Sequence, residues 1–115
     1  MKYSVVVSFS LEGFHCWPEA KEIFPEVGFL SDRHRHMFGF RCYASVSHTD
    51  RDEEFILMQR KLKKQLRVIF GGSILEFGRM SCEDIGEWIL THSENQNLYK
   101  VEVWEDWENG AIIER

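Results

Sequence analysis

An alternating stretch in the first half of the chain constrains the fold more than any other feature. From residue 34 to residue 46, one set of alternate positions is apolar except for two histidines, and it comprises His34, His36, Phe38, Phe40, Cys42, Ala44 and Val46. Successive side chains of a β-strand point to opposite faces, so this period of two predicts a half-buried strand over 33–48. Both imidazoles then extend the buried stripe.

Two histidines separated by one residue on a strand suit a metal site. Their Cα atoms lie roughly 6.5 Å apart and their side chains share one face. His15 is the candidate third ligand, because it closes a second alternating run that begins at Tyr3. Three neutral histidines suit zinc and leave a fourth position open, as in catalytic rather than structural sites. The alternative is that these histidines are polar residues at the entrance of a strand.

Composition limits the classes of protein that the chain can belong to. Its 115 residues, of which 43% are hydrophobic, predict a single domain over 1–115 with its own core. The net charge of -5 argues against nucleic acid and anionic membrane surfaces as partners. No stretch approaches the ~20 apolar residues of a membrane span, and Met1-Lys2 leads into a strand rather than a signal peptide. The three cysteines form no CxxC pair, which predicts a reducing, cytoplasmic location.

Two helices follow the alternating strand. The first carries apolar residues at spacings of three and four, namely Phe55, Met58, Leu62, Leu66 and Ile69. Acidic residues at 52–54 suit its start, and Gly71-Gly72 suits its end. Ser81 with Asp84 resembles a capping arrangement for a second helix over 81–92.

The remaining segments predict strands. Residues 5–11 and 99–105 alternate, and Asn109-Gly110 is a hairpin signal before a last strand at 111–113. The segment from residue 13 to residue 28 is less regular and contains both prolines. The order is strand, strand, helix, helix, strand, strand, which predicts an α+β domain with both helices on one face of an antiparallel sheet.

This order, over nearly the whole length, resembles the tunnelling fold (β2α2β2) of the 6-pyruvoyl- and 6-carboxytetrahydropterin synthases. The family has a zinc-binding histidine after its first strand and a His-x-His pair opening its second, and His15, His34 and His36 fall in those places. Residues 81–89 resemble the start of its second helix, and 101–105 resemble its late strand. The resemblance implies zinc as cofactor and trimeric or hexameric rings with pockets between subunits.

Glu105 matches the glutamate that anchors the pterin in the family. It also shares the apolar parity of Val101 and Val103, where an unpaired carboxylate is costly. The flat N–H edge of a pterin or guanine-type ligand would satisfy it. The alternative is that Glu105 lies at the solvated end of its strand beside Asp106.

The chain also departs from the family pattern at the catalytic positions. Leu30 stands where the family has its catalytic cysteine, and Gly71-Gly72 stands where it has an Asp-His pair. Among residues that could replace the missing base, Asp32 and Glu26 are the candidates. Cys16 follows His15 directly, so alternation predicts that its thiol points away from the metal.

Three hypotheses about function follow. The first is a zinc-dependent lyase that converts 7,8-dihydroneopterin triphosphate to a tetrahydropterin, in tetrahydropterin or 7-deazaguanine (queuosine) biosynthesis, with a replacement base. The second is a synthase-like protein that keeps the zinc and binds a pterin or guanine-type ligand with weak or no turnover. The third is a scaffold in which zinc only holds strand ends together. The absence of the family's base favours the second.

Overall fold

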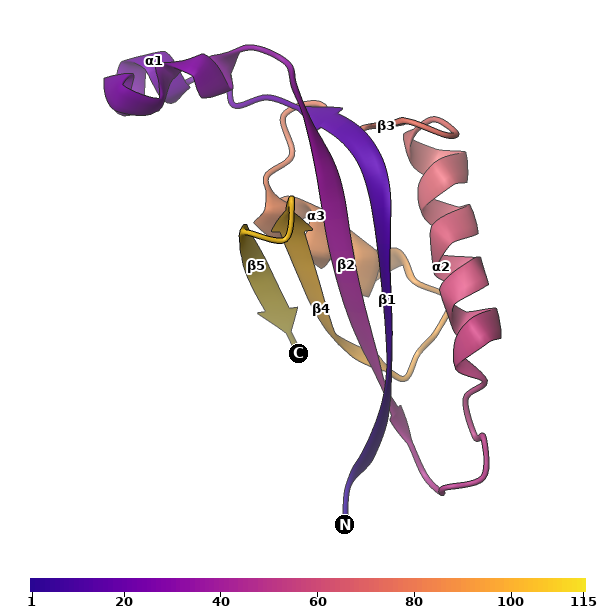
Figure 1. Ribbon diagram of the computed structural model, residues 1–115. Helices are drawn as coiled ribbons and strands as arrows, with labels where there is room; N and C mark the ends of the chain where they lie inside the picture. The colour runs from indigo at the N-terminus through magenta and orange to yellow at the C-terminus, as the bar shows by residue number, and fades with distance from the viewer.

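The computed structural model describes residues 1–115 as one twisted sheet with helices packed against it (Figure 1). In chain order, the elements are β1 (Tyr3–His15), α1 (Ala20–Ile23), a 3₁₀ segment (Pro25–Ser31), β2 (His34–Val46), α2 (Phe55–Phe70), β3 (Leu75–Glu76), α3 (Cys82–His92), β4 (Leu98–Glu105) and β5 (Asn109–Glu114). The strands lie side by side in the order β3-β1-β2-β4-β5. The predicted α+β class and the order of the main elements are confirmed.

The sheet is mixed rather than purely antiparallel. The two-residue strand β3 pairs parallel to β1 at Gly13 and Phe14, while all other neighbouring strands are antiparallel. In the long β1–β2 pair, Phe9 lies opposite Phe40, and His15 lies opposite His34. This register places the end of the first alternating pattern, at His15, beside the start of the second, at His34, at one end of the sheet.

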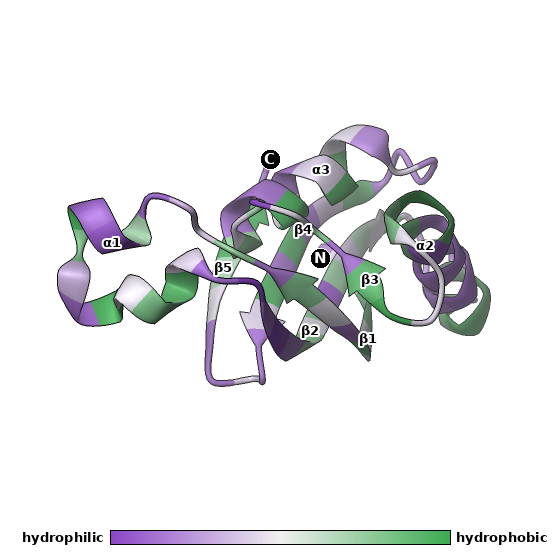
Figure 2. Cartoon of the chain, turned by 90° about the horizontal axis from the view of Figure 1, so that it is seen from above, coloured by the Kyte–Doolittle hydropathy of each residue, from purple (hydrophilic) through white to green (hydrophobic).

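The hydrophobic core lies between the sheet and the two long helices, which Figure 2 shows on the same side of the strands. The largest fully buried side chains are Phe38, Phe40, Leu66, Leu75, Ile85, Ile89, Leu98, Val101, Val103 and Cys42. Among the strand members, Phe38, Phe40 and Cys42 of β2 and Val101 and Val103 of β4 have the parity that alternation predicted, whereas Leu98 pairs beyond a register shift and has the opposite parity. Each large apolar side chain contributes roughly 1.5–3 kcal/mol when it leaves water. A one-residue shift of a strand would turn its apolar side chains to the solvent, so the face that each strand presents to the core is strongly favoured.

The ends of both helices follow the local signals in the sequence. The Glu54 side chain caps α2 by accepting hydrogen bonds from two backbone N–H groups of the first turn. Gly71 ends the helix in the left-handed region, at φ 109°. Ser81 and Asp84 form the predicted capping box at the start of α3, because each side chain accepts from the other's backbone N–H group.

The segment between β1 and β2 is more ordered than the sequence predicted. β1 continues to His15, and α1 with the 3₁₀ segment then forms an arm that projects from the end of the sheet (Figure 1). Three apolar side chains of this arm, Ile23, Phe24 and Phe29, are 54%, 56% and 68% exposed. Within one chain the arm therefore has apolar surface without a partner.

The turn between β4 and β5 corrects the sequence prediction. Asn109-Gly110 does not form the turn but opens β5, and the chain reverses at residues 106–108 instead. Asp106 and Trp107 adopt positive φ values of 52° and 57°, which aspartate tolerates but which are unfavourable for a bulky residue such as tryptophan. Two contacts hold them there: the Asp106 carboxylate accepts from the Met37 N–H group, and the Trp107 ring lies against Gly39, where a side chain would leave no room.

None of the helices combines the length and the hydropathy needed to cross a lipid bilayer. Assembly into rings stays a prediction, since the structure describes a single chain.

Candidate metal centre

Three histidines converge at the end of the sheet where β1 ends and β2 begins. His15 is the last residue of β1, and His34 and His36 are the first and third residues of β2. One ring nitrogen from each histidine lies within 4.8 Å of the other two. The cross-strand register makes His34 the partner of His15, and the strand period puts His36 on the same face. The structure therefore brings together the three residues that the sequence proposed as metal ligands.

Each imidazole is oriented by a hydrogen bond at Nδ1. Nδ1 of His15 lies 2.9 Å from the Met80 carbonyl oxygen, and Nδ1 of His34 lies 2.8 Å from the Asp32 carbonyl oxygen. Nδ1 of His36 lies 2.7 Å from Oδ2 of Asp106. All three partners accept hydrogen bonds, so the proton of each neutral ring resides on Nδ1 and the lone pair on Nε2.

The three Nε2 atoms are buried and have no hydrogen-bond partner. Buried polar atoms without partners are rare in folded proteins and call for an explanation. Neutral imidazoles that present Nε2 lone pairs to one point, with Nδ1 bound to a carboxylate or a carbonyl, are the arrangement of histidine ligands of a transition metal. The donor set therefore fits a divalent ion such as zinc.

The carboxylate of Glu105 lies beside this cluster, at the end of β4. Oε2 is 3.0 Å from Nε2 of His15, and Oε1 is 3.7 Å from Nε2 of His36. Burial disfavours the charged form of His15, but the nearby Glu105 carboxylate and the Met80 carbonyl together outweigh burial and raise the pKa of His15. The contact with His15 in turn lowers the pKa of Glu105, and burial opposes this shift.

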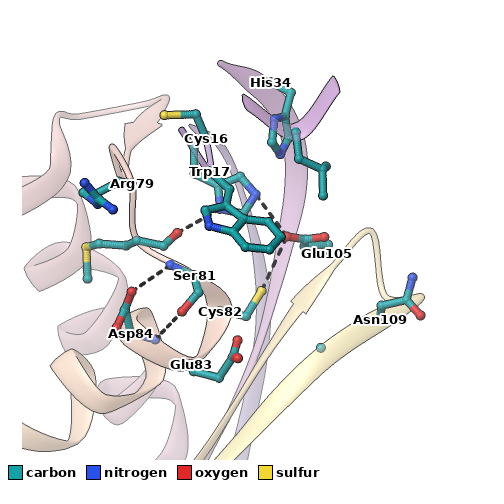
Figure 3. Close-up of a pocket in the computed structure, with 14 residues that line it drawn as sticks. Cys16, Trp17, His34, Arg79, Ser81, Cys82, Glu83, Asp84, Glu105 and Asn109 are labelled. Carbon is teal, nitrogen blue, oxygen red and sulfur yellow. Dashed lines mark hydrogen bonds and ion pairs between the residues drawn. The ribbon is translucent and has the colours of Figure 1, made fainter. Parts of the chain in front are cut away.

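A cavity of about 570 Å³ adjoins the histidine cluster. Figure 3 shows its walls: the loop after β1 contributes Cys16 and Trp17, and the start of α3 contributes Ser81 and Cys82. The volume lies within the usual range for small-molecule sites. His15, His34 and Glu105 line the same cavity, so a small molecule bound there would contact the metal site directly.

Cys82 is the one thiol of the cavity wall that is buried. Its Sγ donates to Oε2 of Glu105 over 3.8 Å. Burial, together with the negative charges of Glu105 and Glu83, raises the pKa of Cys82 to about 12. In the metal-free chain the thiol is therefore protonated at neutral pH and is not poised to act as a general base.

The two candidate replacement bases lie outside the cavity wall in the single chain. Asp32 and Glu26 are exposed, and Asp32 contributes only its backbone carbonyl to the cluster, as the acceptor for His34. Leu30 lines the cavity with an apolar side chain. The roles proposed for Asp32 and Glu26 stay predictions.

The other two cysteines differ in where they lie: one is in the core and one lines the cavity. Cys42 lies in the core as predicted, and burial raises its pKa to about 12. Cys16 lines the cavity, because β1 ends at His15 and strand alternation does not extend to the next residue. The thiol of Cys16 is not one of the convergent ligand atoms.

Sequence reasoning did not identify Asp106, Met80 or Trp17 as parts of the site. Asp106 follows Glu105 directly, so alternation places it on the opposite face of the sheet. The positive-φ turn returns its carboxylate to His36. The Met80 carbonyl has no side-chain signal, and Trp17 lies in a segment without a periodic pattern, so neither could have been found from the sequence.

No protein-family model matches this chain, and no curated protein sequence matches it. Solved structures resemble it over almost all of both chains. The 6-pyruvoyl tetrahydropterin synthase of Caenorhabditis elegans is 16% identical with a TM-score of 0.67, and the match covers 100% of this chain and 96% of that one. The enzyme of the same name from Plasmodium falciparum is 14% identical with a TM-score of 0.63, covering 99% and 98%.

An uncharacterized protein from Wolinella succinogenes is 13% identical with a TM-score of 0.64, covering 100% of this chain and 99% of that one. At such identities the likeness shows the fold alone. The chain has the architecture of the 6-pyruvoyl tetrahydropterin synthases, as its sequence motifs implied.

Proposed function

We propose that this chain is a 6-pyruvoyl/6-carboxytetrahydropterin synthase-like protein that holds zinc through His15, His34 and His36 and binds a pterin or guanine-type ligand with weak or no turnover. The observation that carries the proposal is the set of three buried Nε2 atoms without hydrogen-bond partners. A bound zinc ion would satisfy all three and act as a Lewis acid toward hydroxyl groups of a ligand in the cavity.

The cavity supports a planar, nitrogen-rich ligand. Glu105 offers carboxylate oxygens at its wall, and a pterin or a guanine has adjacent N–H donors on one edge that a carboxylate accepts together. Trp17 and Leu30 provide apolar surface for the faces of such a ring. The fold is shared with synthases whose names specify a tetrahydropterin, which supports the same ligand class.

Weak or absent turnover follows from the residues that are missing. The cavity has Leu30 in place of the family's catalytic thiol, and Gly71 and Gly72 end α2 without any ionisable group. Cys82 is held in its neutral form. General acid–base catalysis is typically worth 10²–10⁴-fold in rate, so a site that lacks it can bind a substrate while converting it slowly.

A ring-shaped assembly forms part of the proposal. The single chain leaves apolar residues of the arm exposed, together with the unpaired outer edge of β5. Sheet edges and apolar patches of this kind are usually covered by another chain. We expect light scattering at micromolar concentration to give the mass of a trimer or a hexamer. A monomer at the same concentration would contradict the assembly and would leave the cavity as a site within one chain.

Three free cysteines suit a reducing compartment, so we assign the protein to the cytoplasm.

The ligand test is calorimetric titration of the zinc-loaded protein with 7,8-dihydroneopterin triphosphate and with guanine, alongside chromatography of the products. We expect binding without appreciable product. Glu105→Gln should weaken binding, because one acceptor oxygen becomes an amide donor that faces the donors of the ligand. Glu108→Gln is the matched control, since Glu108 lies exposed in the neighbouring turn and does not line the cavity.

Two results would contradict this function. Rapid, zinc-dependent formation of a carboxy- or pyruvoyl-pterin would instead establish an active lyase, and Asp32→Asn and Glu26→Gln would then identify its base. If no pterin, guanine derivative or nucleotide bound, zinc would serve only to hold the strand ends together.

A further inference from the structure

Both oxygens of the Glu105 carboxylate face the histidine cluster. Oε2 lies 3.0 Å from Nε2 of His15, and Oε1 lies 3.7 Å from Nε2 of His36. The side chain is 29% exposed, so it forms part of the wall rather than extending into solvent. In this conformation, the oxygens are directed to the place where the three imidazoles converge.

This contact places two electron-rich atoms against each other unless a proton or a metal ion lies between them. Nδ1 of His15 and Nδ1 of His36 are bound to acceptors, so the neutral rings carry lone pairs on Nε2. A lone pair and a carboxylate oxygen repel each other at these distances. A metal ion bound by all of these atoms removes the repulsion and also satisfies the buried Nε2 atoms.

The observed separations suit ligands of one ion. Zinc binds histidine nitrogen and carboxylate oxygen at about 2.0–2.2 Å, and two such ligands at a tetrahedral angle lie about 3.4 Å apart. The separations of 3.0 Å and 3.7 Å lie on either side of this value. Glu105 therefore needs no rearrangement of the backbone to join the three histidines.

The surrounding structure fixes the Glu105 backbone. Glu105 is the last residue of β4 and pairs with Phe38 of β2. The next residue, Asp106, accepts hydrogen bonds from the Met37 N–H group and from His36. These contacts hold the Glu105 backbone in place, so only the side-chain torsions of Glu105 have to be fixed when an ion binds.

We propose that Glu105 is the fourth protein ligand of the metal when the cavity holds no small molecule, so that the resting site is closed. This inference rests on the metal site of the proposed function and deepens it. A ligand that binds the Glu105 carboxylate must then take it from the metal. Small molecule and metal therefore compete for one side chain, and binding of the small molecule opens a coordination position on the ion.

The first arm of the test measures zinc affinity by competition with a chromophoric chelator. Glu105→Gln and Glu105→Ala should bind zinc at least about tenfold more weakly than the wild type, because each removes a charged ligand. Glu108→Gln controls for the loss of one negative charge nearby, and its affinity should equal that of the wild type. Thermal unfolding of the metal-free proteins establishes that each variant is folded.

The second arm compares the wild-type protein with Glu105→Ala, each loaded with Co²⁺ in place of zinc. A closed site has no position for an added anion, so azide should leave the visible absorption spectrum unchanged. In Glu105→Ala the same addition should change the spectrum, because water in the fourth position is replaceable.

The outcomes distinguish this inference from the proposed function. Equal zinc affinity in the wild type and both Glu105 variants, with a spectrum of the wild type that responds to azide, would overturn the role of Glu105 alone. Failure of the wild type to bind Zn²⁺ or Co²⁺ would overturn the metal site itself.

Discussion

Two buried polar clusters in this molecule, one around Glu102 and one formed by the three histidines, differ in how far their polar atoms are hydrogen-bonded. On the sheet face away from the helices, Glu102 is only 6% exposed, yet both oxygens of its carboxylate accept hydrogen bonds from neighbours. Oε2 accepts from the Tyr43 hydroxyl over 2.5 Å, and Oε1 accepts from Trp104 Nε1 over 2.9 Å and from Arg41 over 3.4 Å. Burial raises the pKa of Glu102, but these donors outweigh it and lower the pKa overall.

The histidine cluster shows the opposite pattern of hydrogen bonding. Its outer nitrogens are satisfied, but the three Nε2 atoms that face one another are not. A buried network whose members are all satisfied specifies structure, whereas convergent unsatisfied atoms are costly unless something binds to them. Burial and polarity alone therefore do not mark a binding site, whereas several unpartnered atoms that converge on one point do.

The largest expected effect separates the clusters by metal content. His34→Ala and His36→Ala each remove one of three histidine ligands, so the purified variants should retain little of the roughly one zinc per chain that we expect in the wild type. Elemental analysis of the three proteins measures this. Equal and negligible zinc in all of them would remove the distinction between the clusters.

A smaller effect is expected at the outer hydrogen bond of the metal site. Asp106→Asn keeps the size of the side chain but exchanges the carboxylate that orients His36 for an amide. Loss of such an outer partner typically weakens metal binding about 10–100-fold. Chelator competition measures the affinity, and a wild-type value for the variant would show that the turn orients His36 without the carboxylate.

The smallest effect belongs to the satisfied cluster and appears in stability rather than in binding. Tyr43→Phe removes a donor from Glu102, and a buried acceptor that loses its partner costs about 1–3 kcal/mol. The same hydrogen bond raises the pKa of Tyr43 to about 12. Urea unfolding should give a lower free energy of unfolding, while zinc affinity stays at the wild-type value. A change in zinc affinity would mean that the two clusters are coupled through the sheet.

The sequence by itself determined the properties that depend on near neighbours along the chain. Alternation put His34 and His36 on the buried face with Phe38, because successive side chains of a strand point in opposite directions. The cap at Ser81 was predictable because a capping side chain reaches only the first turn of its own helix, and the acidic residues 52–54 indicated the start of α2 for the same local reason. These rules do not need the partner strands to be known.

Only the tertiary structure decided which of these residues meet. His15 joins His34 because the β1–β2 register pairs them over a long hairpin, and no local pattern fixes that alignment. Asn109-Gly110 has strong turn chemistry, yet the chain turns earlier, at Asp106 and Trp107. Contacts with Met37 and Gly39 of the neighbouring strand offset the unfavourable backbone of that turn, and such distant contacts override local preference.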